Sequence, residues 1–217
     1  MKYLVAFLFL AIAPAALAFN IQILEPERPY APQIAEYTAG EQTVLLGSLE
    51  DYPIMYQLVV KDESELELRL RQSSRASAEP IPFSLIAVKQ SGTRNGVAEV
   101  GRITPKPEEW NRIKDSNFGM SFREAEALIV SVEPGVYNIE VSTAINEGKY
   151  MLLLGNQENK VGYFDSISDI RATQKFFGYS IFSMLTVAQI YYPIGITLLL
   201  FAIHRTWKHR KKIAHVD

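Results

Sequence analysis

Residues 133–155 read EPGVYNIEVSTAINEGKYMLLLG, and this stretch decides the fold class. It contains two runs in which apolar and polar residues alternate, and a short polar loop joins them. The apolar positions are Val136, Ile139 and Val141 in the first run and Tyr150, Leu152 and Leu154 in the second. Such alternation is typical of strands with one buried face, and Pro134-Gly135 favours a type II turn before them. The stretch predicts a β-hairpin that closes a β-rich fold.

Similar apolar runs, bounded by turn-forming residues, occur throughout the preceding part of the chain. They lie at Asn20–Leu24, Gln42–Leu49, Ile54–Val60, Glu65–Arg71, Phe83–Lys89, Val97–Thr104 and Leu128–Glu133. Short strands separated by turn signals are typical of two packed antiparallel sheets. The sequence therefore predicts a mainly β chain with an antiparallel, jelly-roll-like β-sandwich over residues 19–160.

One segment, Pro105–Gly119, does not have the strand pattern. We expect a helical turn over Glu108–Lys114, because proline is favoured at the first position of a helix. Trp110 and Phe118 are expected to pack beneath this segment as a lid on the sandwich edge. The alternative is that these two aromatic side chains contact a ligand.

The first 18 residues have the features of a secretory signal peptide. Lys2 gives a charged start, Leu4–Ile12 is apolar, and Ala16-Leu17-Ala18 fits a small-residue cleavage site. We expect cleavage before Phe19 and export of the β-sandwich.

The segment Ile181–Ile203 contains no charged residue, which predicts a transmembrane helix within residues 176–203. Residues 161–175 are expected to form a juxtamembrane neck or an amphipathic segment at the membrane surface. Residues 204–217 form a basic tail, and basic flanks stay in the cytoplasm. This pattern predicts a type I single-pass protein of the cell membrane, with its N-terminal domain outside the cytoplasm.

Four residues of this segment are candidates for contact with a partner helix. An amide such as that of Gln189 is costly in an apolar environment and favours bonding to another helix, together with Tyr191 and Tyr192. The alternative is a bond to the backbone or to Thr186. Pro193 is expected to kink the helix and to release a carbonyl group near Gln189.

The basic tail supplies a second set of candidate contacts. Its members are Arg205, Lys208, Arg210, Lys211 and Lys212. Such a cluster attracts anionic lipid or only sets the membrane topology. The expected partners are membrane lipid and another membrane or envelope protein, and nothing indicates nucleic acid.

The two runs of the opening stretch resemble the end of bacterial pre-peptidase C-terminal domains, which are small jelly-roll-like β-sandwiches. The matching residues are Gly135, Tyr137, Ile139, Val141, Gly148, Tyr150, Leu152 and Leu154. The resemblance implies the fold and a binding role beside other domains. The order of signal, sandwich, apolar segment and basic tail also resembles p24 cargo receptors, although the cysteine pair of that family is absent.

The residues available for chemistry are restricted. The chain has no cysteine, and its three histidines, His204, His209 and His215, all lie in the tail. This excludes from the sandwich the nucleophile systems that use His or Cys and the common zinc sites. We expect no cofactor and no catalysis, but a membrane-anchored envelope protein that binds a partner or ligand as an accessory subunit. Alternatives are a carbohydrate- or cell-wall-binding module, a p24-like cargo receptor and a hydrolase that uses carboxylates.

Overall fold

The computed structural model describes residues 17–18, 20–23, 28–75, 79–91, 96–157, 159–160 and 162–213. The strands are β1 (Leu17–Ala18), β2 (Asn20–Ile23), β3 (Gln33–Ile34), β4 (Thr43–Glu50), β5 (Ile54–Val60), β6 (Ser64–Ser73), β7 (Ser84–Gln90), β8 (Val97–Ile103), β9 (Asn111–Asp115), β10 (Met120–Glu124), β11 (Leu128–Val132), β12 (Gly135–Ser142), β13 (Glu147–Leu154) and β14 (Asn159–Lys160). The helices are η1 (Pro107–Glu109), α2 (Tyr163–Phe176), η2 (Ile181–Thr186) and α3 (Ala188–Ile213). The signal-peptide prediction falls almost entirely outside the described residues and stays a prediction.

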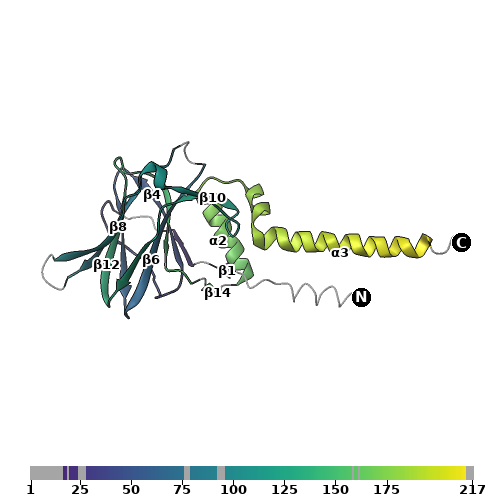
Figure 1. Cartoon of the computed structure of the whole chain (residues 1–217), viewed down its shortest axis with the longest axis horizontal. Helices are drawn as coiled ribbons and strands as arrows, with labels where there is room; N and C mark the ends of the chain where they lie inside the picture. The colour runs from purple at the N-terminus through teal and green to yellow at the C-terminus, as the bar shows by residue number, and fades with distance from the viewer. Residues whose placement is uncertain are drawn as a thin grey trace.

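The strands form a β-sandwich, as the alternating runs predict. One sheet has the order β2-β4-β13-β6-β10-β9, with β11 also paired to β6, and the other has the order β3-β5-β12-β7-β8. Most pairs are antiparallel, but β2 runs parallel to β4 and β3 runs parallel to β5. The expectation of wholly antiparallel sheets is therefore wrong at these two edges. Figure 1 shows the sandwich at one end of the molecule and α3 projecting from the other.

The hairpin predicted for residues 133–155 is wrong, although both of its strands exist. β12 pairs with β5 and β7 in one sheet, whereas β13 pairs with β4 and β6 in the other. The connecting turn crosses between the sheets, and Thr143 and Asn146 hydrogen bond to each other's backbone within it. The short polar loop is thus an arch over the edge of the core.

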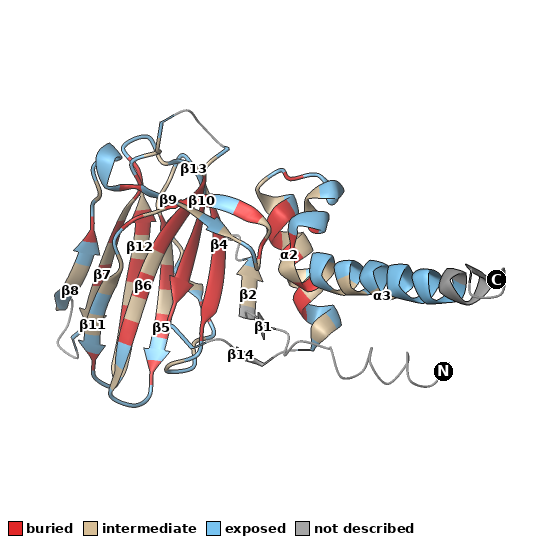
Figure 2. Ribbon diagram, turned by 45° about the vertical axis from the view of Figure 1, so that its right-hand side comes forward, coloured by how far each residue is buried: buried red, intermediate tan, exposed pale blue. Residues whose placement is uncertain are grey.

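The two faces of the larger sheet are both covered, which explains the unbroken apolar run in β13. Tyr150, Leu152 and Leu154 face the core between the sheets, while Met151 and Leu153 belong to a second apolar cluster on the outer face. That second cluster is completed by residues of α2, η2 and the start of α3. Figure 2 shows the buried positions concentrated in the central strands and at the sheet–helix junction.

A buried pair of tyrosines connects the two sheets. The hydroxyl groups of Tyr56 in β5 and Tyr150 in β13 lie 2.9 Å apart and hydrogen bond to each other. Burial raises the pKa of both hydroxyl groups, so both stay protonated at ordinary pH. Gly47 of β4 faces the pair, and a Cβ atom there would lie 2.4 Å from the Tyr150 hydroxyl oxygen. Only glycine leaves room for both rings at this point.

We predict that Tyr56→Phe lowers the free energy of unfolding by about 1–3 kcal/mol, because the Tyr150 hydroxyl is then buried without a partner. Tyr150→Phe should have a similar effect for the same reason. The double variant should lose less free energy of unfolding than the two single variants lose together, because neither position then has a hydroxyl without a partner. Urea unfolding of all four proteins as a double-mutant cycle measures this coupling, and simple additivity would contradict it.

The segment Pro105–Gly119 contains a strand that the sequence pattern did not indicate. The helical turn is confined to η1, and the chain then extends as β9, which pairs with β10. Ile113 of β9 packs against the second apolar cluster, on the outer face of the larger sheet (the outer-face cluster). This contact favours an extended backbone at β9.

The predicted transmembrane helix is wrong. Ile181–Thr186 forms the short helix η2, and Val187 is extended, so the apolar segment is interrupted before α3 begins at Ala188. Met184 and Val187 are buried in the outer-face cluster rather than exposed on a continuous helix. The uncharged part of α3 ends at Ile203 and is shorter than the about 20 residues that a bilayer core requires. Within the described part of the chain, no helix has the length and apolarity needed to span a membrane.

Candidate docking surface

The base of α3 is held firmly against the larger sheet. Ile170 of α2, Met184 of η2 and Val187 pack on side chains of β4, β10 and β13. The amide nitrogen of Gln174 donates to the carbonyl oxygen of Phe118 at 2.9 Å, and Ala188 N donates to the carbonyl oxygen of Ser116 at 2.9 Å. These bonds attach α2 and the start of α3 to the same turn, between β9 and β10.

That turn requires a glycine at its point of closest approach to η2. Gly119 has φ +61°, and a Cβ atom there would lie 2.6 Å from the hydroxyl oxygen of Thr186. The Thr186 hydroxyl donates to the carbonyl oxygen of Gly119 at 2.9 Å, so the two chain segments are in direct contact. A side chain at position 119 would push η2 and α3 away from the sheet.

Pro193 and Tyr163 together fix the first turn of α3. Proline has no backbone N–H, so the carbonyl group of Gln189, four residues earlier, has no donor within the helix. The hydroxyl of Tyr163, the first residue of α2, donates to that oxygen at 2.7 Å. The carbonyl that the sequence predicts Pro193 to release is therefore used to join α2 to α3.

Further along α2, burial and the neighbouring Asp165 raise the pKa of Asp169.

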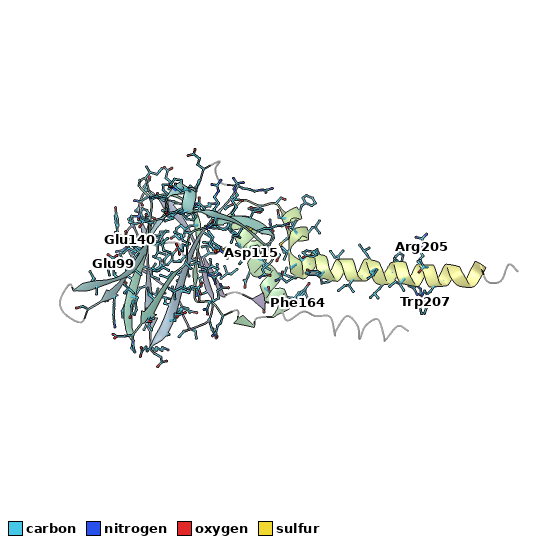
Figure 3. The ribbon with its side chains drawn as sticks, viewed as in Figure 1. Glu99, Asp115, Glu140, Phe164, Arg205 and Trp207 are labelled. Atoms are coloured by element: carbon cyan, nitrogen blue, oxygen red, sulfur yellow. The ribbon has the colours of Figure 1, made fainter. Side chains whose placement is uncertain are left out.

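Beyond its base, α3 has no apolar neighbour in the described part of the chain. Its exposed apolar residues are Tyr191, Tyr192, Ile194, Leu198, Leu199, Phe201, Ile203 and Trp207. At about 100° per residue they cover roughly two-thirds of the helix circumference. We call them the α3 surface. Figure 2 shows exposed positions along the length of α3, and Figure 3 shows Trp207 standing out from it.

The residues predicted to contact a partner helix occupy two different environments. Gln189 is 5% exposed and belongs to the base of α3, where its side-chain oxygen makes no hydrogen bond with the described residues. The proposed contact of Gln189 with a partner helix stays a prediction. Tyr191 and Tyr192 are exposed, with ring centroids 4.3 Å apart, and begin the α3 surface. Pro193 lies between these two regions.

The basic residues predicted to contact lipid extend from the far end of α3. Arg205 and Lys208 are exposed on the helix, and Figure 3 labels Arg205. The side chains of Arg210, Lys211 and Lys212 lie outside the described part of the structure.

The two aromatic residues considered for ligand contact are both buried. Trp110 packs in the core between the sheets, and Phe118 packs in the outer-face cluster with no exposed surface. The structure does not bring them together, and neither ring faces solvent.

A cleft of about 760 Å³ lies at the sandwich edge between the ends of β8, η1 and β10. Three of its four charged side chains have partners: Glu109 accepts from the backbone of Lys106, Arg102 pairs with Glu99, and Glu124 pairs with Arg71. No group of three or more potential metal ligands occurs among the described residues.

The sequence pattern gave no indication of the contacts that hold α3 in place. Tyr163, Gln174 and Thr186 are polar residues in segments expected to be a neck and a membrane span. The only local signal was Pro193, which implies an orphan carbonyl but not its donor.

The sequence matches no protein-family model and no curated protein. Solved structures of similar fold include the pre-peptidase C-terminal domain of a collagenase from Bacillus anthracis, with TM-score 0.36 and 16% identity over 60% of this chain and 98% of that one. They also include a mitogen from Yersinia pseudotuberculosis, with TM-score 0.37 and 14% identity over 55% and 89% of the two chains. A periplasmic inhibitor of g-type lysozyme from Aeromonas hydrophila has TM-score 0.35 and 16% identity over 64% and 100%. A β-sandwich of the kind that residues 135–154 resemble is thus among the similar structures, and likeness at this level assigns no function.

Proposed function

We propose that this chain is a non-catalytic accessory protein of the cell envelope. Its exported β-sandwich is attached to a partner membrane protein through the α3 surface. The observation that carries the proposal is the apolar surface of α3, which no described residue covers although the base of α3 is fixed to the sandwich. A helix that is apolar around most of its circumference is normally buried within protein or another apolar environment.

The chemistry of the partner follows from the composition of α3. The α3 surface fits a groove between apolar helices, and two tyrosines and a tryptophan supply the aromatic anchors that protein interfaces favour. The exposed Arg205 and Lys208 then meet acidic groups of the partner or the anionic lipid around it. Because Tyr163 and Gly119 fix the direction of α3, docking would hold the sandwich at a fixed angle to the partner.

The test places a photo-crosslinking amino acid at Leu198 or Phe201 in the full-length protein, expressed in its own host membrane fraction. Val97 and Ile129, which are 64% and 55% exposed on the sandwich, serve as control positions. We expect one protein to be crosslinked from both α3 positions and from neither control. Leu198→Glu/Phe201→Glu should reduce co-purification of that protein by at least about tenfold, because each buried apolar side chain contributes about 1.5–3 kcal/mol.

The sandwich of this double variant should unfold at the same temperature as the wild type, since both side chains are more than 60% exposed. Crosslinks to lipid alone, or only to a second copy of the chain, would overturn the proposal. Equal co-purification of the variant and the wild type would overturn it as well.

A further inference from the structure

A small polar pocket lies on the outer face of the larger sheet, beside the turn that holds α2. It encloses about 300 Å³, which is at the lower end of the sizes of small-molecule sites. Its walls are Gln42 before β4, Arg69 and Arg71 of β6, Asp115 and Asn117 at the end of β9, and Leu153 and Asn156 at the end of β13. Figure 3 labels Asp115 on the side of the sandwich that faces α2. We call it the carboxamide pocket, after Gln42, Asn117 and Asn156.

The backbone holds one wall of this pocket in place. Gly155 N donates to the carbonyl oxygen of Glu67 at 2.8 Å, and Gln157 N donates to the carbonyl oxygen of Gly40 at 2.9 Å. These bonds fix Asn156 between them. Gly155 has φ +77°, and a Cβ atom there would lie 2.5 Å from the carbonyl oxygen of Glu41, so the close approach requires glycine.

Asp115 organises the opposite wall. One of its carboxylate oxygens accepts from the backbone N–H groups of Asn117 and Phe118, at 2.9 and 3.3 Å. The other accepts from Arg71 at 3.0 Å, and Arg71 also pairs with Glu124. The turn that carries Asn117 is therefore fixed, and the charge of Arg71 is already balanced.

Several polar groups of the pocket remain without a partner among the described residues. The side chain of Gln42 is 4% exposed, lines the pocket and makes no hydrogen bond there. The side-chain amides of Asn117 and Asn156 likewise make none. Arg69 lines the pocket too, and its Nε atom lies 2.9 Å from Glu67. Most of the Gln42 side chain is therefore buried, while its carboxamide lines the pocket and is available to a ligand.

The charges of the pocket disfavour an anionic ligand, and its donor and acceptor groups suit a neutral polar molecule. Each of the two arginines already faces a carboxylate, and Asp115 itself lines the pocket, so an added anion would meet repulsion. Carboxamides offer a donor and an acceptor side by side, which matches hydroxyl groups that both donate and accept. We infer that the carboxamide pocket binds one neutral sugar residue, with Gln42, Asn117, Asn156 and Arg69 bonding its hydroxyl groups. The site is independent of the docking proposed for α3.

The experiment titrates full-length protein, purified in a detergent without a sugar headgroup, with glucose, galactose, N-acetylglucosamine and short oligomers of each. Isothermal titration calorimetry should show saturable binding of at least one of them to a single site. Gln42→Met keeps the volume of the side chain and removes its amide, so binding should weaken about tenfold or more. Asn156→Ala should weaken binding similarly, and because Asn156 is exposed this change does not threaten the fold.

Gln57→Met, on the outer face of the smaller sheet, is the matched control and should bind as the wild type does. The urea-unfolding midpoint of Gln42→Met should be unchanged, since the side-chain amide of Gln42 makes no hydrogen bond with the described residues that the variant would lose. Tighter binding of oligomers than of monomers supports a glycan chain as the ligand, and equal binding supports a free sugar. Absence of binding to every sugar, equal binding by the Gln42 and Asn156 variants and the wild type, or stronger binding of acetate or phosphate would overturn the inference.

Discussion

Arg71→Met is expected to lower the free energy of unfolding by about 3–5 kcal/mol, as removal of one partner from a buried ion pair does. The side chain of Arg71 is 8% exposed and lies directly opposite Glu124 in the β6–β10 ladder. It pairs with Glu124 and with Asp115, and its guanidinium carbon lies 5.7 Å from the centroid of the Phe122 ring. Methionine keeps most of the apolar volume, so the loss reports the two carboxylates left without a cation. Urea unfolding by circular dichroism measures it.

Two further variants separate charge from packing in this prediction. Arg102→Met removes a cation from the exposed Glu99 pair and should cause no measurable loss, because solvent screens such pairs. Adding Asp115→Asn and Glu124→Gln to Arg71→Met should recover most of the stability, since no uncompensated charge then remains. If Arg71→Met unfolds no more easily than Arg102→Met, the three-residue ion cluster is not a stabilising feature of the fold.

The sequence predicted the strands well because alternation reports burial of one face. Ile54–Val60 matches β5 at both ends, and the alternation of Glu65–Arg71 lies within β6. In each, every second residue faces the core between the sheets. This signal is local, so it does not depend on knowing the partner strand.

Pairing is not local, and the predicted hairpin failed for that reason. A short polar turn can return a strand beside its predecessor or carry it across to the opposite sheet, and the turn residues suit both. The difference was visible only in β13, where Met151 and Leu153 break the alternation. A strand that is apolar on both faces must be covered on both, and α2 and η2 supply the second cover.

The C-terminal region shows the limit of hydropathy as a guide. Ile181–Ile203 is uniformly uncharged, but its residues have two different environments. Met184 and Val187 are buried against the larger sheet, whereas most residues of α3 in this segment are exposed. The packing sites for Met184 and Val187 depend on Phe118 and Gly119, which lie more than sixty residues earlier in the chain. The carboxamide pocket was equally hidden, since Gln42, Arg69, Asn117 and Asn156 lie on four separate segments.

Phe118→Ala tests the junction between the sandwich and the helices, and it should lower the free energy of unfolding by about 3–5 kcal/mol. The Phe118 ring has no exposed surface and packs edge-on against Phe122, with ring centroids 6.1 Å apart. Its removal leaves a cavity in the outer-face cluster, where residues of α2 and η2 meet the sheet.

A second readout distinguishes this junction from the core between the sheets. In Phe118→Ala, limited proteolysis should release α2 and α3 before the sandwich is cut, because local opening is easiest where packing has been lost. Leu152→Ala, in the other core, should lower stability without that order of cleavage. Phe182→Ala is the surface control, since its side chain is 76% exposed on η2, and it should behave as the wild type. Simultaneous cleavage of sandwich and helices in Phe118→Ala would show that the two parts open as one unit. The junction at Phe118 would then not be a region that opens by itself.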